Sequence, residues 1–456
     1  MLGPVYCNDM PGHVNVQFLR RGWGAILGAM WRKIGLPAVV TLAVLLGLAA
    51  YVRRQGGALP GLPLQPLPEA LAPAIAAGDS AAVATAARAR CRLLADSPRR
   101  ACLEDFLLQL VRRDRVRLAM GTLDLLGQRD AEIRRIGHDY SHVIGINAWA
   151  PGKDIGEVYL QCNELFQSGC YHGVIQAFFA YEGTDSARVV RLCRDHPGMA
   201  DNAWLHFQCV HGIGHGLLQN FAMNLPRALA GCDMLGNYFD SESCYGGAFM
   251  EFIVGGRGQS HHVNTPGMDH GAMARDSSPP FKVRDRSDPL YPCSVLGDRY
   301  QRSCYGMQAG LIVETAGLDF ARVAQVCDSA PEPMRPVCYQ GIGTYVSGVV
   351  VRDPRQAIRQ CNLGSPRFRP WCFVGVVKNF IDVTAKPDDG VAFCRMLGPP
   401  DVASACWRAV GEQATMLFPA MEQREAVCRQ ATAAWVEACR YGAGLTAVRP
   451  PELPVG

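Results

Sequence analysis

Histidine is the residue type whose distribution in this chain points most directly to chemistry. Ten of the eleven histidines fall between residues 138 and 270. Pairs of imidazole or amide side chains recur there four residues apart: His138 with His142, His172 with Gln176, and His211 with His215. This spacing places both members of a pair on one face of a helix, the arrangement that helical metal sites use. We therefore predict that His138, His142, His172, His211 and His215 bind a metal.

The residue types around these histidines indicate the class of metal. Imidazole-rich, carboxylate-poor surroundings suit zinc, copper or iron better than magnesium or calcium. Five histidines exceed what one zinc ion needs, which favours either two metals or one metal plus imidazoles that bind or protonate a substrate. Glu251 is the carboxylate best placed along the chain to act as a general base. Amides at related positions are expected in the second shell or on the substrate: Gln176, Asn147 and Asn220.

A long irregular segment follows the histidine-bearing region, at residues 255–291. It carries further polar residues in the string SHHVNTPGMDHG, namely His261, His262, Asp269 and His270. Long segments inserted into a compact array are often lids or binding loops. We expect this insertion to cover the histidine site.

Eighteen of the nineteen cysteines lie beyond residue 90 and form nine consecutive pairs. We predict a disulfide within each pair, because buried free thiols would explain neither the pairing nor the regular spacing. Zinc ribbons and covalent c-type haem are excluded, because the chain has neither Cys-x-x-Cys nor Cys-x-x-Cys-His. The predicted bonds join Cys91 to Cys102, Cys162 to Cys170, Cys193 to Cys209, Cys232 to Cys244, Cys293 to Cys304, Cys327 to Cys338, Cys361 to Cys372, Cys394 to Cys406 and Cys428 to Cys439.

The second cysteines of successive pairs mostly advance by about 34 residues, the period of stacked two-helix repeats. Each unit is predicted to hold a first helix that ends near the first cysteine, a polar loop, and a second helix that opens with the second cysteine, often followed by an aromatic residue and glycine. The aromatic residues are expected to pack in the core, and the glycines to allow close approach of neighbouring backbones. One unit carries Leu125 and Ile136 in place of cysteines. Counting that unit, ten repeats run from residue 79 to 445.

The string Cys361-Asn362-Leu363-Gly364 resembles the cysteine region of Sel1-like repeats. The helix order, the period and a disulfide within each unit are also similar to cysteine-rich Sel1-like and tetratricopeptide-type repeat proteins. The cysteines lie further apart here than in those families. The resemblance covers about 360 residues and implies an all-α chain folded as an α/α solenoid, of a kind that often binds protein partners.

Residues 34–52 are apolar and uncharged, and are bracketed by Arg32-Lys33 and Arg53-Arg54. Nineteen such residues are enough for one transmembrane helix. The basic residues before it place the tail 1–33 in the cytoplasm and the chain beyond residue 52 outside, by the positive-inside rule. We therefore expect an inner-membrane anchor, a Pro- and Gly-rich linker at 53–78, a periplasmic repeat domain and a short tail at 446–456. A cleaved signal peptide is the alternative.

The charge and the motifs of the chain limit which partners and reactions are expected. The formal charge is +4 and dense basic runs are absent, which argues against nucleic acid as a partner. The chain carries no phosphate-binding loop, dinucleotide fingerprint or nucleophile elbow, so an enzymatic reaction would most readily use metal-activated water or metal–oxygen chemistry. We hypothesise a membrane-anchored protein with a histidine-rich transition-metal site. The alternative is a scaffold that binds protein on its repeat surface and whose histidines are structural.

Overall fold

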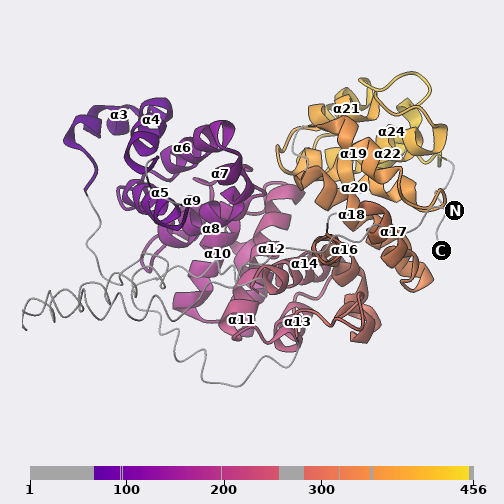
Figure 1. Ribbon diagram of the computed structural model, residues 1–456, viewed down its shortest axis with the longest axis horizontal. Helices are drawn as coiled ribbons and strands as arrows, with labels where there is room; N and C mark the ends of the chain where they lie inside the picture. The colour runs from indigo at the N-terminus through magenta and orange to yellow at the C-terminus, as the bar shows by residue number, and fades with distance from the viewer. Residues whose placement is uncertain are drawn as a thin grey trace, which may run out of the picture. The chain divides into compact units, whose positions relative to one another are not determined.

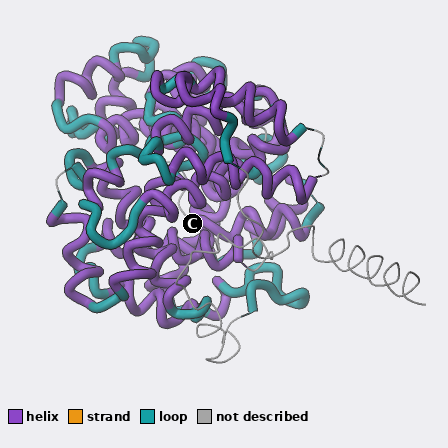
Figure 2. The backbone as a smooth tube through the Cα atoms, turned by 90° about the vertical axis from the view of Figure 1, so that its left-hand side faces the viewer, coloured by secondary structure: helices purple, strands orange, loops and turns teal. Residues whose placement is uncertain are grey.

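The computed structural model describes residues 66–450, except for 93, 95, 197, 256–281, 318 and 350–352. All regular elements within these residues are helices, and none of these residues lies in a β-strand (Figure 2). None of the helices formed by these residues is both long and apolar enough to cross a membrane. The predicted membrane helix at 34–52 and the predicted lid residues His261, His262, Asp269 and His270 lie outside the described residues.

The chain divides into two compact units. The first comprises residues 1–65 and 92–102. Its described residues include the beginning of helix α5 (Asp96–Val111). The second comprises residues 66–91 and 103–456 and holds the histidines of interest. The following description of packing concerns the second unit.

Helices alternate along the sequence between a first and a second helix of each predicted repeat (Figure 1). The first helices are α4 (Ser80–Cys91), α6 (Val116–Arg129), α9 (Ile155–Tyr159), α11 (Ser186–Asp195), α13 (Leu225–Asp233), η2 (Cys293–Val295), α17 (Phe320–Asp328), α19 (Pro354–Cys361), α21 (Pro387–Cys394) and α23 (Met421–Cys428). The second helices, after α5, are α8 (Gly137–Ala148), α10 (Gly169–Glu182), α12 (Ala203–Asn220), α14 (Tyr238–Gly255), α16 (Asp298–Thr315), α18 (Arg335–Val349), α20 (Arg369–Asp382), α22 (Pro400–Leu417) and α24 (Val436–Gly442). Short helices η1 (Glu69–Leu71), α3 (Ala72–Ala77), α7 (Ala131–Arg135) and η3 (Glu332–Met334) complete the set.

Side-chain caps explain where several first helices begin. Asp185 accepts from the backbone N–H of Arg188 at the start of α11, and Asp353 accepts from two backbone N–H groups at the start of α19. Capping of this kind satisfies donors that the helix itself cannot pair. These two caps fix the residues at which α11 and α19 begin.

Disulfides join the two helices of a repeat as the cysteine spacing predicts. In eight of the nine predicted pairs the Cα–Cα distance lies between 5.4 and 5.8 Å. These bonds join Cys162 to Cys170, Cys193 to Cys209, Cys232 to Cys244, Cys293 to Cys304, Cys327 to Cys338, Cys361 to Cys372, Cys394 to Cys406 and Cys428 to Cys439. Cys91 and Cys102 are disulfide-bonded as well. Each crosslink closes a short loop, which limits its stabilisation to about 3 kcal/mol in the loop-closure treatment.

The predicted linker at 53–78 is partly wrong. Residues 69–77 form η1 and α3, and Ile75 and Leu71 from these turns are buried. Pro73 lies in the first turn of α3, where its missing N–H costs no hydrogen bond, and alanines follow it. Proline therefore lies in the first turn of a helix here, whereas the Pro- and Gly-rich composition predicts a spacer.

Close backbone approach holds consecutive second helices together. A Cβ atom built on Gly173 of α10 would lie 2.3 Å from the carbonyl oxygen of His142 on α8, and one on Gly145 would lie 2.1 Å from that of Cys170. The same relation recurs between α12 and α14, at Gly214 and Gly247. Any side chain at these positions would separate the helices. The predicted role of the repeat glycines is thereby confirmed.

Aromatic residues that follow the second cysteine pack inside the array. They are at most 6 % exposed at Tyr171, Tyr245, Tyr305, Tyr339, Phe373 and Trp407. Two of them also pair with the residue after the first cysteine of the same repeat: Tyr339 donates to Asp328 at 2.9 Å, and Tyr245 donates to Asp233. The packing role predicted for these residues is confirmed, and the tyrosine–aspartate bond adds a second link beside the disulfide.

The array also makes a contact between repeats that are far apart in sequence. Helix α12 packs against α22, and Trp204 of α12 donates its indole N–H to Asp382, the last residue of α20, at 2.9 Å. Gln208 donates to the same carboxylate oxygen at 3.2 Å. A single carboxylate thus joins residues separated by more than 170 positions.

Candidate metal centre

Three consecutive second helices carry the five predicted metal ligands. Helix α8 supplies His138 and His142, α10 supplies His172, and α12 supplies His211 and His215. These helices pack in chain order, α8 on α10 and α10 on α12 (Figure 1). Because α8 and α12 each present both of their imidazoles on one face, the five rings meet between the helices. Neighbouring ring centroids lie 4.6 to 5.4 Å apart along the series from His138 through His142, His172 and His211 to His215.

The five histidines form two overlapping groups of three. The outer triad is His138, His142 and His172, and the inner triad is His172, His211 and His215. In each triad, one nitrogen from every ring lies within 4.8 Å of those from the other two. Three imidazoles are the protein ligands of many zinc sites that keep a fourth position open. Either triad could hold a transition-metal ion, and His172 belongs to both.

Each imidazole of the outer pair donates one ring N–H to a protein oxygen. Nδ1 of His138 lies 2.8 Å from the carbonyl oxygen of Phe166, which can only accept. Nδ1 of His142 lies 2.7 Å from Oε1 of Gln176, whose amide nitrogen in turn donates to Glu251 at 3.3 Å. These bonds leave Nε2 of both rings as the nitrogen with the lone pair when the imidazoles are neutral.

The same arrangement fixes His172 and His215. Nε2 of His172 donates to Oε1 of Gln208 at 3.1 Å, and the bond from Gln208 to Asp382 fixes the orientation of that amide. Nδ1 of His215 donates to Oε2 of Glu251 at 2.8 Å. Metal-binding histidines almost always donate their second N–H to a carboxylate, carbonyl or amide oxygen in this way. Four of the five imidazoles are therefore oriented as metal ligands are.

The outer pair brings two lone pairs face to face. Nε2 of His138 and Nε2 of His142 lie 3.1 Å apart, although both rings already donate through Nδ1. Two lone pairs at this distance repel each other unless a cation, either a proton or a metal ion, lies between them. Ligand nitrogens around a tetrahedral ion with bonds of roughly 2.0–2.1 Å lie about 3.3 Å apart. The observed separation is close to that value.

A left-handed stretch of backbone delivers the carbonyl that orients His138. Phe166, Gln167 and Ser168 have φ values of +55°, +54° and +61°. Such values are uncommon for residues with a side chain, and strained backbone concentrates at functional sites. The Phe166 ring occupies the space beside Gly137, where a Cβ atom would lie 2.1 Å from it. The turn and the glycine together place the Phe166 carbonyl against the imidazole.

Burial keeps the inner imidazoles neutral. His172 and His211 are each 2 % exposed, and burial, followed by the neighbouring histidines, holds the pKa of both rings well below the usual value. The bond from His172 to Gln208 opposes that shift, as does the backbone of Ser243 near His211. Neither Nδ1 of His172 nor either ring nitrogen of His211 makes a hydrogen bond of normal geometry. At neutral pH Nδ1 of His172 and one of the two ring nitrogens of His211 therefore offer lone pairs without proton competition.

Glu251 lies inside the cluster, 1 % exposed, on α14. Its Oε2 accepts from His215 and Gln176, and its Oε1 accepts from the amide of Gln219 at 3.1 Å. A carboxylate that accepts from an imidazole in this way fixes the ring and raises its basicity as a ligand. Glu251 therefore orients the cluster, and its contacts do not single it out as the predicted general base.

Gln176 contacts the His142 imidazole, whereas the hydrogen bonds of Asn147 and Asn220 stay within their own helices. Asn147 donates to the carbonyl of Val143, and Asn220 donates to that of Gly216, both at 2.9 Å. Their predicted role at the site stays a prediction. The two asparagines are equivalent in the repeat, since each pairs with the carbonyl four residues before it.

Gln208 is not among the predicted site residues, although the repeat carries a signal for it. Three of the orienting partners lie about one repeat after their imidazole: 34 residues from His142 to Gln176, 36 from His172 to Gln208 and 36 from His215 to Glu251. Adding one period to each histidine therefore identifies its partner on the next second helix. The Phe166 carbonyl has no such signal, because any residue type supplies a backbone oxygen.

The chain matches no protein-family model, no curated protein and no solved structure. The resemblance to Sel1-like and tetratricopeptide-type repeats therefore rests on architecture alone.

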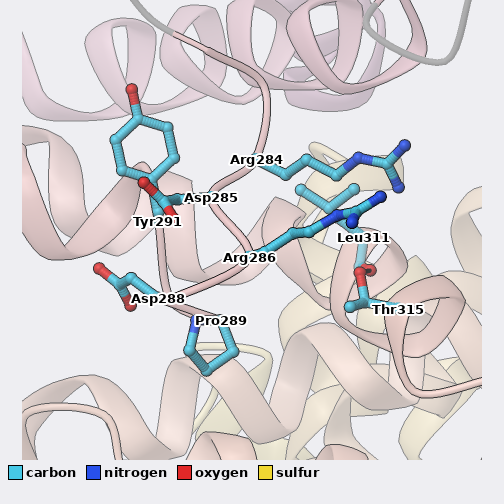
Figure 3. Close-up of a pocket in the computed structure, with 8 residues that line it drawn as sticks. All are labelled: Arg284, Asp285, Arg286, Asp288, Pro289, Tyr291, Leu311 and Thr315. Carbon is cyan, nitrogen blue, oxygen red and sulfur yellow. Dashed lines mark hydrogen bonds between the residues drawn. The ribbon is translucent and has the colours of Figure 1, made fainter.

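A separate cavity of about 120 Å³ lies between the described end of the insertion and α16. Figure 3 shows Arg284 and Arg286 extending side by side towards Leu311 and Thr315 of α16. Its lining residues include none of the five imidazoles. Both arginines are exposed to solvent, whereas most imidazoles of the histidine cluster are buried.

Proposed function

We propose that this protein binds a transition-metal ion through its histidine cluster. The observation that carries the proposal is the pattern of hydrogen bonds around the imidazoles. Each of four rings donates one N–H to a protein oxygen, and every ring offers one nitrogen within 4.8 Å of the ligand nitrogens in its triad. A core that used histidines only for packing would have no need to direct four lone pairs towards one another.

The ligand set favours zinc, copper or iron. All members of both triads are imidazoles, and Glu251 contributes to the cluster through His215 rather than through a triad position of its own. Neutral nitrogen ligands suit these metals, whereas magnesium and calcium select oxygen. Burial of four of the five imidazoles, each at most 2 % exposed, favours capture of the ion over reaction with a large substrate.

We further propose that the cluster lies in an α/α solenoid held outside the cytoplasm by a membrane anchor at residues 34–52. Disulfides persist in oxidising compartments, and eighteen cysteines are disulfide-bonded after the apolar segment. The flanking basic residues support a cytoplasmic amino terminus. In that orientation the metal site faces the periplasm.

Elemental analysis of the purified full-length protein tests the metal site. The protein is exported to an oxidising compartment, purified in detergent and analysed beside a variant in which His138, His142, His211 and His215 are all replaced by Ala. We expect stoichiometric zinc, copper or iron in the parent protein and, with both triads reduced to His172 alone, at least a roughly tenfold lower content in the variant. His196→Ala, at a half-buried histidine outside both triads, is the matched control and should keep its metal. A parent protein that binds none of the three metals would refute the proposal.

Fusions to the carboxyl terminus test the topology. Alkaline phosphatase folds only outside the cytoplasm, and unexported green fluorescent protein fluoresces only inside it. We expect phosphatase activity without fluorescence, together with retention in the membrane fraction after a carbonate wash. Fluorescence of the fusion would place the repeats in the cytoplasm, and release by carbonate would contradict the anchor.

A further inference from the structure

His172 is the one imidazole that the two triads share. Its Nε2 donates to Gln208, and the amide of Gln208 is held in turn by Asp382. Only Nδ1 of His172 is therefore left to bind a metal, and this nitrogen is buried without a hydrogen-bond partner. One lone pair binds one ion at a time, so the two triads cannot both be filled with three imidazoles.

We propose that the two triads are an outer and an inner station for a single metal ion, which passes between them through His172. The inference rests on the proposed metal binding and adds the number of ions and their route. In the outer station the ion is bound by His138, His142 and His172. In the inner station it is bound by His172, His211 and His215.

Burial sets the direction of entry. His138 is half-buried, whereas His142, His172, His211 and His215 are 0 to 2 % exposed. An ion from solvent therefore meets the outer station first. The rings of the two stations are neighbours, since the centroid of His142 lies 5.1 Å from that of His215 and His172 lies 4.9 Å from His211. No step between the stations is longer than the spacing within one of them.

Transfer is an exchange of ligands without oxidation, reduction or release of a proton. The bonds from the metal to His138 and His142 break, and bonds to Nε2 of His215 and to one nitrogen of His211 form. The bond to Nδ1 of His172 persists throughout. The oxidation state of the metal stays the same, and no proton is released, because the incoming nitrogens already carry lone pairs. Sites of three imidazoles suit this exchange, since each leaves a position open for an incoming ligand.

The experiment counts zinc ions and times their exchange in the full-length protein. Zn²⁺ is the probe, with stoichiometry from elemental analysis after dialysis and rates from a colorimetric chelator. The parent protein should hold one equivalent. The outer variant, His138→Gln with His142→Gln, should still bind one equivalent but take it up at least roughly tenfold more slowly. The inner variant, His211→Gln with His215→Gln, should also bind one equivalent and lose it to the chelator at least roughly tenfold faster.

Glutamine fills much of the space of histidine, and far-ultraviolet circular dichroism with thermal unfolding checks that each variant folds. If a double variant unfolds, the single variants His142→Gln and His215→Gln repeat the comparison. Two equivalents in the parent protein would overturn the shared station, because the triads would then be independent. Unchanged exchange rates in both folded variants would also overturn it. A parent protein that binds no Zn²⁺, copper or iron would refute the proposed function itself.

Discussion

Glu251 connects the inner triad to the next second helix through a single carboxylate. It accepts from His215, Gln176 and Gln219, so its negative charge is distributed over three donors inside the core. A buried charge of this kind requires pairing, and the imidazole supplies the closest partner at 2.8 Å. The residue therefore orients His215 and strengthens it as a ligand without belonging to either triad.

Replacing Glu251 with Gln should weaken metal binding. The side chain keeps its size, but the orienting bond to His215 loses its charge, and loss of such a partner typically lowers metal affinity about 10- to 100-fold. Competition with a chelator of known affinity measures the change. Glu242→Gln is the control on the same helix, since Glu242 accepts from Ser303 and touches no imidazole by any recorded bond. Equal affinities in the two variants would remove Glu251 from the site.

Gln167 occupies the middle of the left-handed turn that presents the Phe166 carbonyl to His138. A residue with a side chain costs roughly 1–2 kcal/mol in this conformation, and a β-branched residue costs more. We expect Gln167→Gly to keep or raise the free energy of unfolding by up to about 1 kcal/mol. Gln167→Val should lower it by at least about 1 kcal/mol and reduce metal affinity. Denaturant titration and chelator competition measure both, and a Val variant as stable as the Gly variant would contradict this account.

At the scale of elements, glycine decides how near the second helices lie. Gly145 and Gly173 let α8 and α10 touch backbone to backbone, which brings His142 and His172 within reach of a common ion. Gly214 and Gly247 do the same for α12 and α14, and so bring His215 to Glu251. The histidine cluster thus depends on helix spacing as much as on the histidines themselves.

Gly173→Ala should both destabilise the protein and weaken metal binding. The new Cβ would lie 2.3 Å from the His142 carbonyl and 2.8 Å from the Ile146 amide, and neither backbone atom can move alone. Overpacking of this kind costs about 1–3 kcal/mol. Gly306→Ala is the control, since its Cβ would meet only Val337 at 3.7 Å. The helix would then gain up to about 1 kcal/mol. Thermal unfolding should show a lower midpoint for Gly173→Ala and an unchanged or higher one for Gly306→Ala. Zinc competition should show weaker binding in Gly173→Ala alone.

At the scale of the whole repeat unit, Asp382 joins α20 to α12 and is linked to the histidine cluster through Gln208. Burial raises the pKa of this carboxyl from 3.8 to about 6, although the bonds from Trp204 and Gln208 favour the ionised form. In the folded protein the Asp382 carboxyl therefore stays protonated over a pH range in which it is ionised in the unfolded chain. The stability that this group contributes is present below about pH 4 and is lost as the pH rises through about 6.

Asp382→Asn should remove that pH dependence. The asparagine side chain keeps an oxygen acceptor for Trp204 and Gln208 without a buried charge, so the variant should be more stable than the parent above about pH 6.5, by at most about 3 kcal/mol. Near pH ~4 the two proteins should unfold at similar temperatures, because the parent carboxyl is then neutral. Thermal unfolding from about pH 4 to about pH 8 measures the difference, with the exposed Asp389→Asn as control. A variant that is less stable at every pH would contradict the raised pKa.

Local sequence patterns were sufficient to predict the helix pairs, the disulfides and the positions of the imidazoles within their helices. These features depend on short-range order: the 3.6-residue turn sets which side chains share a face, and a cysteine pair 8 to 16 residues apart can only bridge adjacent helices. The periodic cysteines also align equivalent positions, and so relate His138 and His142 to His211 and His215 without any knowledge of the packing.

The grouping of the five imidazoles into two triads that share His172 follows only from the packing of the helices. That outcome depends on how far apart α8, α10 and α12 lie and on which ring nitrogen each neighbour engages. Three groups set these details: the Phe166 carbonyl, the Gln208 amide and the Asp382 carboxylate. They lie 28, 36 and 174 residues, respectively, along the chain from the groups that they bond. Contacts over such separations are fixed by the packing of whole helices, which local sequence patterns do not encode.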